Sequence, residues 1–287
     1  MFTDNPTIPA RLEVLLDVLH IMRDRKTDRE AVRSLLQPPG LSGLTEASRQ
    51  ADEHLSASQQ LGLVEVDVSG NFRLAYRVRG EHSPRKAILD AFDRVALGSS
   101  ETEPWASRFY AFLIVQDQDA TNHGAEVQAA VSRAFNNALP PHIDRANPMN
   151  SDKFRSLMRW YQYVGLGWID PGGGFVPDPT VRLMRSMQAI FGKAKTLDAA
   201  EAMSRIATAC PELDGGSLFL EVTASYYNSA DRVCTRALAT ALRSLHDQQV
   251  LRLSCPRDSK GWSLARSGSV LIPGVLDSDR FDRIAFA

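Results

Sequence analysis

Asp178 and Glu221 are acidic side chains of the kind that hold catalytic metal ions in nucleases. Glu221 lies in the run FLEVT, which predicts a strand over Ser217–Val222. Metal-dependent nuclease sites usually add a lysine two residues after the second acid, and this chain has Thr223 there. Asp178 is also well placed to cap the helix predicted over Val181–Phe191. The two acids therefore give little support to nuclease chemistry.

Other sequence signatures of catalysis are absent: the chain has no GxSxG, HExxH or Walker motif. The glycine run at 171–174 joins two short apolar segments, so it predicts a hairpin turn, because a phosphate loop would lead from a strand into a helix. Cys210, Cys234 and Cys255 share no CxxC spacing, so neither a disulfide framework nor a zinc site is predicted. We therefore predict a protein that is not an enzyme and that needs no cofactor and no metal.

Basic residues form a second kind of candidate site, one for nucleic acid. A helix predicted over 151–164 places arginines opposite its apolar face. A longer helix predicted over 229–248 places three arginines on one face, and its following loop adds two more basic residues. A solvated arginine face fits this second pattern equally well. The nucleic-acid-binding candidates are Lys153, Arg155, Arg159, Arg232, Arg236, Arg243, Arg257 and Lys260.

The first 83 residues predict three helices and a hairpin. Apolar residues recur at helical spacing over 11–23, Asp28 can cap a second helix that ends at Leu36, and Thr45 opens a third. The alternation VEVDV, the turn SGN and the run FRLAY then predict two paired strands. Three helices followed by a hairpin form the winged helix-turn-helix motif. The expected surface of the third helix is mixed to acidic, which favours a protein-contacting or structural role over DNA reading: Glu46, Arg49, Gln50, Asp52, Glu53 and His54.

The same order of elements recurs twice. The middle copy ends in the helix at 151–164, a glycine pair, and two short strands around the glycine turn. The last copy has a helix over 197–209 capped by Thr196, the long helix at 229–248, a wing formed by the strands 250–253 and 262–264, and a loose acidic tail with Asp277, Asp279 and Asp282. We predict a mainly α fold with small β-hairpins, built of tandem winged helix-turn-helix modules. The predicted domains are 1–83, 84–195 with a linking helix, and 196–287.

Composition restricts the function further. Hydrophobic residues make up 44% of the 287 residues and charged residues 23%, as in ordinary globular proteins. The net charge is −1, and the three predicted domains carry −2, +2 and −1, so none has the positive excess typical of a domain that holds nucleic acid through its phosphates. No apolar run is long enough to cross a membrane, and the N-terminus has no signal-peptide pattern, so we expect a cytoplasmic protein without membrane partners.

Three segments of the chain resemble the DpdG proteins. They are the first wing LGLVEVDVSGNFRLAY, the central FRSLMRWYQYVGLGWIDPGGGFVPDPT and the terminal winged segment; the most specific motif is GLGW followed by FVPDPT. DpdG proteins are accessory proteins of the bacterial gene islands that place 7-deazaguanine bases in DNA and restrict foreign DNA. The resemblance implies a place in a DNA-modification or antiviral defence system beside ATPase and helicase neighbours. It implies no catalytic residue.

Two functions follow from these patterns. The first is a non-catalytic winged-helix subunit that docks onto other subunits of a DNA-processing complex and that also contacts double-stranded DNA. The second is a sequence-specific DNA-binding transcriptional regulator, which would depend on Arg232, Arg236 and Arg243. The mismatch between a DNA-binding type of architecture and a neutral charge favours the first.

Overall fold

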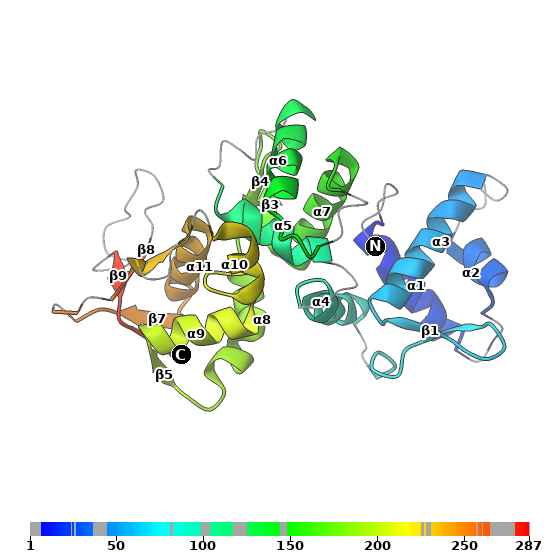
Figure 1. The fold of residues 1–287 in the computed structure, drawn as a ribbon. Coiled ribbons are helices and arrows are strands. Elements are labelled where there is room, and N and C mark those ends of the chain that lie inside the picture. The colour runs from blue at the N-terminus through cyan, green and yellow to red at the C-terminus, as the bar shows by residue number, and fades with distance from the viewer. Residues whose placement is uncertain are drawn as a thin grey trace. The chain divides into compact units, whose positions relative to one another are not determined.

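The computed structural model describes residues 7–23, 25, 27–36, 45–80, 83–98, 104–116, 125–143, 148–224, 227, 231–256, 258–259, 261–264 and 279–286. Over these residues the protein is mainly helical, with small sheets of two or three strands (Figure 1). Its contacts define two compact units, which are Met1–Glu103 with Asp152–Tyr163, and Pro104–Ser151 with Val164–Ala287. The division at 83 and 195 stays a prediction, because a unit of contacts need not coincide with a sequence module.

The first unit opens with three helices that pack against one another and a hairpin (Figure 1). The α1 residues Leu12, Leu15, Leu16 and Leu19 are buried at helical spacing, and Asp28 accepts a hydrogen bond from the backbone N–H of Ala31 at the start of α2. The hairpin predicted around Gly70 is confirmed: Val64 pairs with Leu74, and Gly70 has a φ of 80° at its turn. We call these elements the N-terminal bundle: α1 Pro9–Ile21, α2 Arg29–Leu36, α3 Thr45–Gln60, β1 Val64–Val66 and β2 Phe72–Leu74.

Thr27, between α1 and α2, ties this segment to the hairpin. Its carbonyl accepts from the N–H of Phe72 at 2.9 Å, and its hydroxyl donates to the Phe72 carbonyl at 2.6 Å. The buried Thr27 therefore acts like a one-residue strand beside β2. It fixes where the hairpin lies on the helices.

His54 is buried, which corrects the expectation that it faces solvent on the third helix. Its Nε2 accepts from the N–H of Ile8 at 3.0 Å, and its Nδ1 donates to the Gln50 carbonyl at 2.6 Å. These two bonds need the neutral imidazole, since the protonated ring has no acceptor. Burial also lowers the pKa of His54, because desolvation disfavours the charged imidazolium. The ring therefore holds the start of α1 onto α3.

Two further helices complete the first unit: α4, Pro84–Val95, and most of α7, Ser151–Val164. Trp160 of α7 is fully buried and stacks on Phe92 of α4, with ring centroids 5.2 Å apart. Its indole N–H donates to the Thr7 hydroxyl at 3.1 Å. The Tyr163 hydroxyl donates to the Glu13 carboxylate at 2.5 Å. These contacts explain why α7 belongs to this unit although α5 and α6 lie between it and α4 in the chain.

The second unit begins with α5, Pro104–Ile114, and α6, Ala125–Ala138. Phe135 of α6 lies between Phe109 and Phe112 of α5, with centroid distances of 4.9 and 5.6 Å. The hairpin predicted at the glycine run is confirmed as β3, Gly167–Ile169, with β4, Phe175–Pro177, in antiparallel register.

The last part of the second unit is a three-helix bundle on a three-stranded sheet. The helices α8 and α9 pack together, and α11 packs on α8. The sheet order is β5-β10-β7, so the strand between α8 and α9 and the strand after α11 both pair with the last strand. We call this the C-terminal bundle and include the turn and helix that join α9 to α11: α8 Thr180–Phe191, β5 Thr196–Asp198, α9 Ala199–Ala209, α10 Ser217–Thr223, α11 Arg236–Asp247, β7 Leu251–Ser254 and β10 Arg283–Phe286.

Three predicted elements of this bundle are wrong. The segment predicted as a strand at Ser217–Val222 is the helix α10, which buries Leu218, Phe219 and Val222 at helical spacing. The long helix begins only at Arg236, because Arg232 has a φ of 51° and Val233–Cys234 form the strand β6. The cap of α9 is Asp198, whose carboxylate accepts from the N–H of Glu201 at 2.8 Å, while Thr196 lies in β5.

The third wing also differs from its prediction. β7 pairs with β10, whereas β8, Trp262–Leu264, lies between β6 and β9, Arg280–Phe281, in a second small sheet. The tail predicted as loose therefore supplies strands to both sheets. These strands form because the segment FDRIAF contains apolar residues that the sheets can bury. Phe281 and Ile284 are both buried.

Candidate functional site

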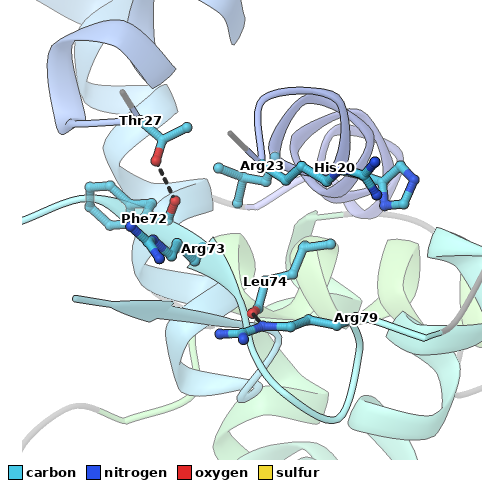
Figure 2. Close-up of a pocket in the computed structure, with 8 residues that line it drawn as sticks. His20, Arg23, Thr27, Phe72, Arg73, Leu74 and Arg79 are labelled. Carbon is cyan, nitrogen blue, oxygen red and sulfur yellow. Dashed lines mark hydrogen bonds between the residues drawn. The ribbon is translucent and has the colours of Figure 1, made fainter. Parts of the chain in front are cut away.

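A pocket of about 270 Å³ opens on the N-terminal bundle between α1, β2 and the turn after it (Figure 2). Figure 2 shows His20 of α1 and Arg23 of the turn after it on one side, the strand residues Phe72, Arg73 and Leu74 opposite, and Arg79 along the lower edge. Four of the eight lining side chains are basic or imidazole. The lining residues are Leu19, His20, Arg23, Thr27, Phe72, Arg73, Leu74 and Arg79.

Hydrogen bonds fix two arginines of this pocket. The Arg79 Nε donates to the Leu74 carbonyl at 2.9 Å, and its Nη2 donates to the Glu65 carboxylate. The Arg73 Nη2 lies 2.8 Å from Asp67 Oδ2. The pKa of Asp67 is lowered, first by the hydrogen bond from the Asn71 N–H and less by the N–H of Ser69 and the charge of Arg73. The hairpin therefore orients both guanidinium groups.

The predicted nucleic-acid residues of α7 do not share one environment. Lys153 is buried, with 1% of its surface exposed, which corrects the expectation that it lies on the basic face open to phosphates. Arg155 and Arg159 are exposed, as expected. Arg155 hydrogen-bonds the Asp152 carboxylate one turn away, so its charge is partly balanced. Two exposed arginines remain as the basic face of α7.

The predicted basic face of the last helix is also incomplete. Arg232 is exposed but precedes β6, so it does not lie on α11. Arg236 is half-buried at the start of α11. Arg243 Nη2 donates to the Leu264 carbonyl at 3.3 Å and lies 3.5 Å from Asp279 Oδ1, which ties it to the strands behind the helix. Arg257 and Lys260 lie outside the described residues. The prediction that Arg232, Arg236 and Arg243 share one helical face is therefore wrong, because Arg232 lies outside α11.

Both acids considered for nuclease chemistry have structural partners. The Glu221 carboxylate lies 2.7 Å from Arg108 Nε in an ion pair between α10 and α5. Asp178 Oδ1 accepts from the N–H and hydroxyl of Thr180 where α8 begins. Among the described residues, no group of three or more His, Cys, Asp or Glu side chains is arranged to hold a metal ion.

A buried carboxyl group supports the start of α11. Asp214 accepts from the Thr235 N–H at 2.6 Å and from the Thr235 hydroxyl at 2.7 Å, while Thr235 Oγ1 caps the Leu238 N–H at 3.3 Å. Burial raises the pKa of Asp214 to about 6, against these hydrogen bonds. Burial, reinforced by the Asp214 charge, raises the pKa of the Cys234 thiol. A raised pKa suppresses the reactive thiolate, so Cys234 is not a candidate nucleophile.

The pocket was missed by sequence reasoning, because its walls come from four separate segments. One signal was present: Arg73 and Arg79 lie in and just after the second predicted strand, whereas the expected surface of the third helix is mixed to acidic. The basic side chains of this predicted module are therefore expected away from the helix that would read DNA.

The fold and these surfaces define a mainly helical protein with small, largely antiparallel sheets and arginine-rich surface sites. The chain belongs to the DpdG-like family, whose model matches residues 2–259. This membership confirms the resemblance seen in the sequence and associates the chain with the multi-gene system that modifies DNA with 7-deazaguanine bases. No curated protein and no solved structure matches the chain. Within the described part of the chain, no helix is both long and apolar enough to cross a bilayer.

Proposed function

We propose that this protein is a non-catalytic winged-helix subunit of the DNA-modification and defence complex of its family. It docks onto other subunits in the cytoplasm, without a membrane partner, and it contacts double-stranded DNA through a minor basic surface. The observation that carries the proposal is the sheet order β5-β10-β7. A strand between α8 and α9 that pairs with the antiparallel strands following α11 is typical of the winged form of helix-turn-helix, which supports the proposal.

The N-terminal bundle supports the same assignment. Thr27 occupies the place of β5, since it lies between the first two helices and pairs with Phe72 of β2. Helix α3 would be the DNA-reading helix of this module. Its acidic residues Asp52 and Glu53 are partly exposed, and Asp52 already pairs with Arg29 and Arg33, so this surface offers phosphates little unbalanced positive charge. This module is therefore proposed to contact protein.

Direct DNA contact is proposed for the exposed arginines Arg155 and Arg159, with Arg232 and Arg236 as a second set. The chain as a whole has a net charge of −1, so DNA contact alone would hold it weakly at physiological salt. Docking to partner proteins would supply the rest of the affinity. The alternative, a free-standing transcriptional regulator, has less support because Arg243 is engaged by Asp279 and Leu264.

Affinity purification tests the docking function. The tagged chain is co-expressed with the products of the neighbouring genes of its modification system, and the eluate is examined by size-exclusion chromatography with light scattering. The proposal expects a complex of defined stoichiometry. A chain that elutes alone under all combinations of neighbours would remove the docking function.

Gel-shift titration against salt tests DNA contact. Charge reversal at Arg155 and Arg159 should weaken duplex binding and lower the salt slope by about two, because each arginine would neutralise about one phosphate. Reversal at the exposed Lys193 and Lys195 is the matched control and should leave the slope unchanged. Tight, sequence-selective binding by the isolated chain would instead favour the regulator. Metal-dependent nuclease activity that disappears in Asp178→Ala would contradict a non-catalytic role.

A further inference from the structure

The pocket of the N-terminal bundle has unused hydrogen-bond donors. Arginine carries five N–H donors in a planar fork. Arg73 contacts Asp67 through Nη2, and Arg79 uses Nε and Nη2 for Leu74 and Glu65. Each guanidinium group therefore keeps N–H groups that can be given to a ligand. An anionic group of a ligand can therefore bind these N–H groups without breaking the pairs of Arg73 with Asp67 and of Arg79 with Glu65.

Apolar surface accompanies this charge. Leu19 and Leu74 line the pocket beside the arginines. Outside the pocket, Ile21 at the end of α1, Val68 in the hairpin turn and Tyr76 just after β2 expose 77%, 107% and 83% of their surface. Exposed apolar and aromatic residues mixed with arginine are typical of protein interfaces. The ligand should therefore combine negative charge with an apolar group.

The geometry disfavours a nucleic acid here. Glu65 and Asp67 already balance the charge of Arg79 and Arg73, so the pocket lacks the continuous positive surface that a line of phosphates needs, whereas a single carboxylate needs only the remaining N–H donors. A hollow of about 270 Å³ fits one or two side chains and is too small for a duplex backbone with its neighbouring phosphates. A single carboxylate side chain fits the hollow and can pair with the planar guanidinium fork.

We propose that this pocket binds an acidic segment of a partner protein, in which a carboxylate side chain neighbours an apolar one. The carboxylate pairs with Arg73 and Arg79 while the apolar side chain rests on Leu19 and Leu74. This inference rests on the docking function proposed above and gives the chemistry of the docked segment.

A defined probe tests the pocket directly. A fluorescein-labelled peptide of alternating glutamate and leucine is titrated with the full chain, and anisotropy is recorded. Arg73→Gln should weaken binding by about tenfold, because it removes a charge-assisted hydrogen bond at a partly exposed site. His20→Gln tests the opposite wall and should weaken binding to a smaller extent. Arg77→Gln is the matched control, since Arg77 is exposed just after the hairpin and does not line the pocket.

The outcomes separate cleanly. Binding that weakens in Arg73→Gln and is unchanged in Arg77→Gln supports the inference. Absence of binding by the wild-type chain, or equal binding by both variants, overturns it. Displacement of the peptide by inorganic phosphate or by a short DNA duplex at equal concentration also overturns it, because the pocket would then be a phosphate site.

The same variants separate this inference from the proposed docking function. If the wild-type chain recovers its partners and Arg73→Gln recovers them equally well, docking occurs elsewhere and the pocket inference fails alone. If the wild-type chain recovers no partner, the docking function fails, and the peptide titration still decides what the pocket binds. Circular dichroism of each variant checks that the fold is kept. We expect no loss of fold, because the substituted side chains are exposed.

Discussion

The N-terminal and C-terminal bundles share an order of elements but handle charge differently. In both, the segment between the first two helices pairs with the last strand of the wing, through Thr27 in one and through β5 in the other. The ion pairs of the N-terminal bundle are partly or largely exposed, as for Arg33 with Asp52. The C-terminal bundle has an exposed pair as well, Arg205 with Glu201, but it also buries the ion pair of Arg182 and Glu212. The difference teaches that one module type can keep a polar outer surface for docking or use polar groups as internal supports.

The buried ion pair of Arg182 and Glu212 is the strongest case. Arg182 Nε lies 2.8 Å from Glu212 Oε1, and the two side chains are only 7% and 0% exposed. Arg182 also donates to Ser186 Oγ at 2.7 Å and to the Ala209 carbonyl at 3.1 Å. It therefore joins α8, the end of α9 and the turn before α10.

The largest effect is expected from Glu212→Ala. This change leaves the Arg182 charge buried without its carboxylate, which should lower the free energy of unfolding by about 3–5 kcal/mol. Asp52→Ala in the N-terminal bundle is the matched change and should cost about 1 kcal/mol or less, because its pairs are partly solvated. Urea unfolding followed by hydrogen exchange of each bundle measures both. Equal losses would break the comparison.

A pH response is the next largest effect. The pKa of Asp214 is 3.8 when unfolded and about 6 when folded, so its contribution is fully present below pH 4 and is lost as the pH rises through 6. The C-terminal bundle should lose on the order of 3 kcal/mol across that range. Hydrogen exchange of α11, corrected for the intrinsic pH dependence, measures this. Asp214→Asn should abolish the response, and a response that persists would show that another group titrates.

Two glycines sharpen the comparison of packing. An added Cβ at Gly216 would lie 2.3 Å from the Pro211 carbonyl oxygen, whereas at Gly70 it would meet nothing within 4 Å. Gly216→Ala should therefore cost about 2 kcal/mol through overpacking. Gly70→Ala should cost about 1 kcal/mol, from its positive φ alone. Thermal unfolding of the two variants decides, and a larger loss for Gly70→Ala would contradict the prediction.

The smallest effect is the acid response of the N-terminal bundle. The pKa of His54 is lowered by burial from its ordinary 6.5, so its contribution is present above pH 6.5 and is lost as the pH falls through the folded pKa. The sign is opposite to that of Asp214. Exchange of α1 amides should thus increase on acidification while α11 becomes more protected. His54→Gln, which can still donate and accept, should remove the α1 response; an unchanged response would exclude His54 as its source.

Much of the helical framework could be predicted from sequence because it depends on local signals. Leu12, Leu15, Leu16 and Leu19 mark one face of α1, and glycine turns locate the first two hairpins. The long-range pairings could not be predicted in this way. The strand β10 pairs with β5 although α9, α10 and α11 lie between them in the chain, and no local pattern specifies that partner.

The candidate sites were less predictable than the fold. Exposure of Arg155 and Arg159 follows from the apolar face of α7, but nothing local shows that Lys153 is buried. Helical spacing continues through Arg232 and therefore predicts that it lies on the helix. In the structure, the positive φ of Arg232 and the contact between Asp214 and Thr235 make α11 begin later, at Arg236. The basic pocket could not be predicted from the sequence, because its lining residues come from separate segments that meet only in the folded protein.

The position of β10 has a consequence for synthesis. It is the central strand of the β5-β10-β7 sheet, yet its residues Arg283–Phe286 leave the ribosome after those of every other described element. Until then β5 and β7 have exposed backbone edges and no common partner, while the N-terminal bundle can already be folded. A nascent C-terminal bundle is thus exposed to wrong strand partners for the whole interval, and a chaperone or an early-docking subunit that shields those edges would raise the yield of the native protein.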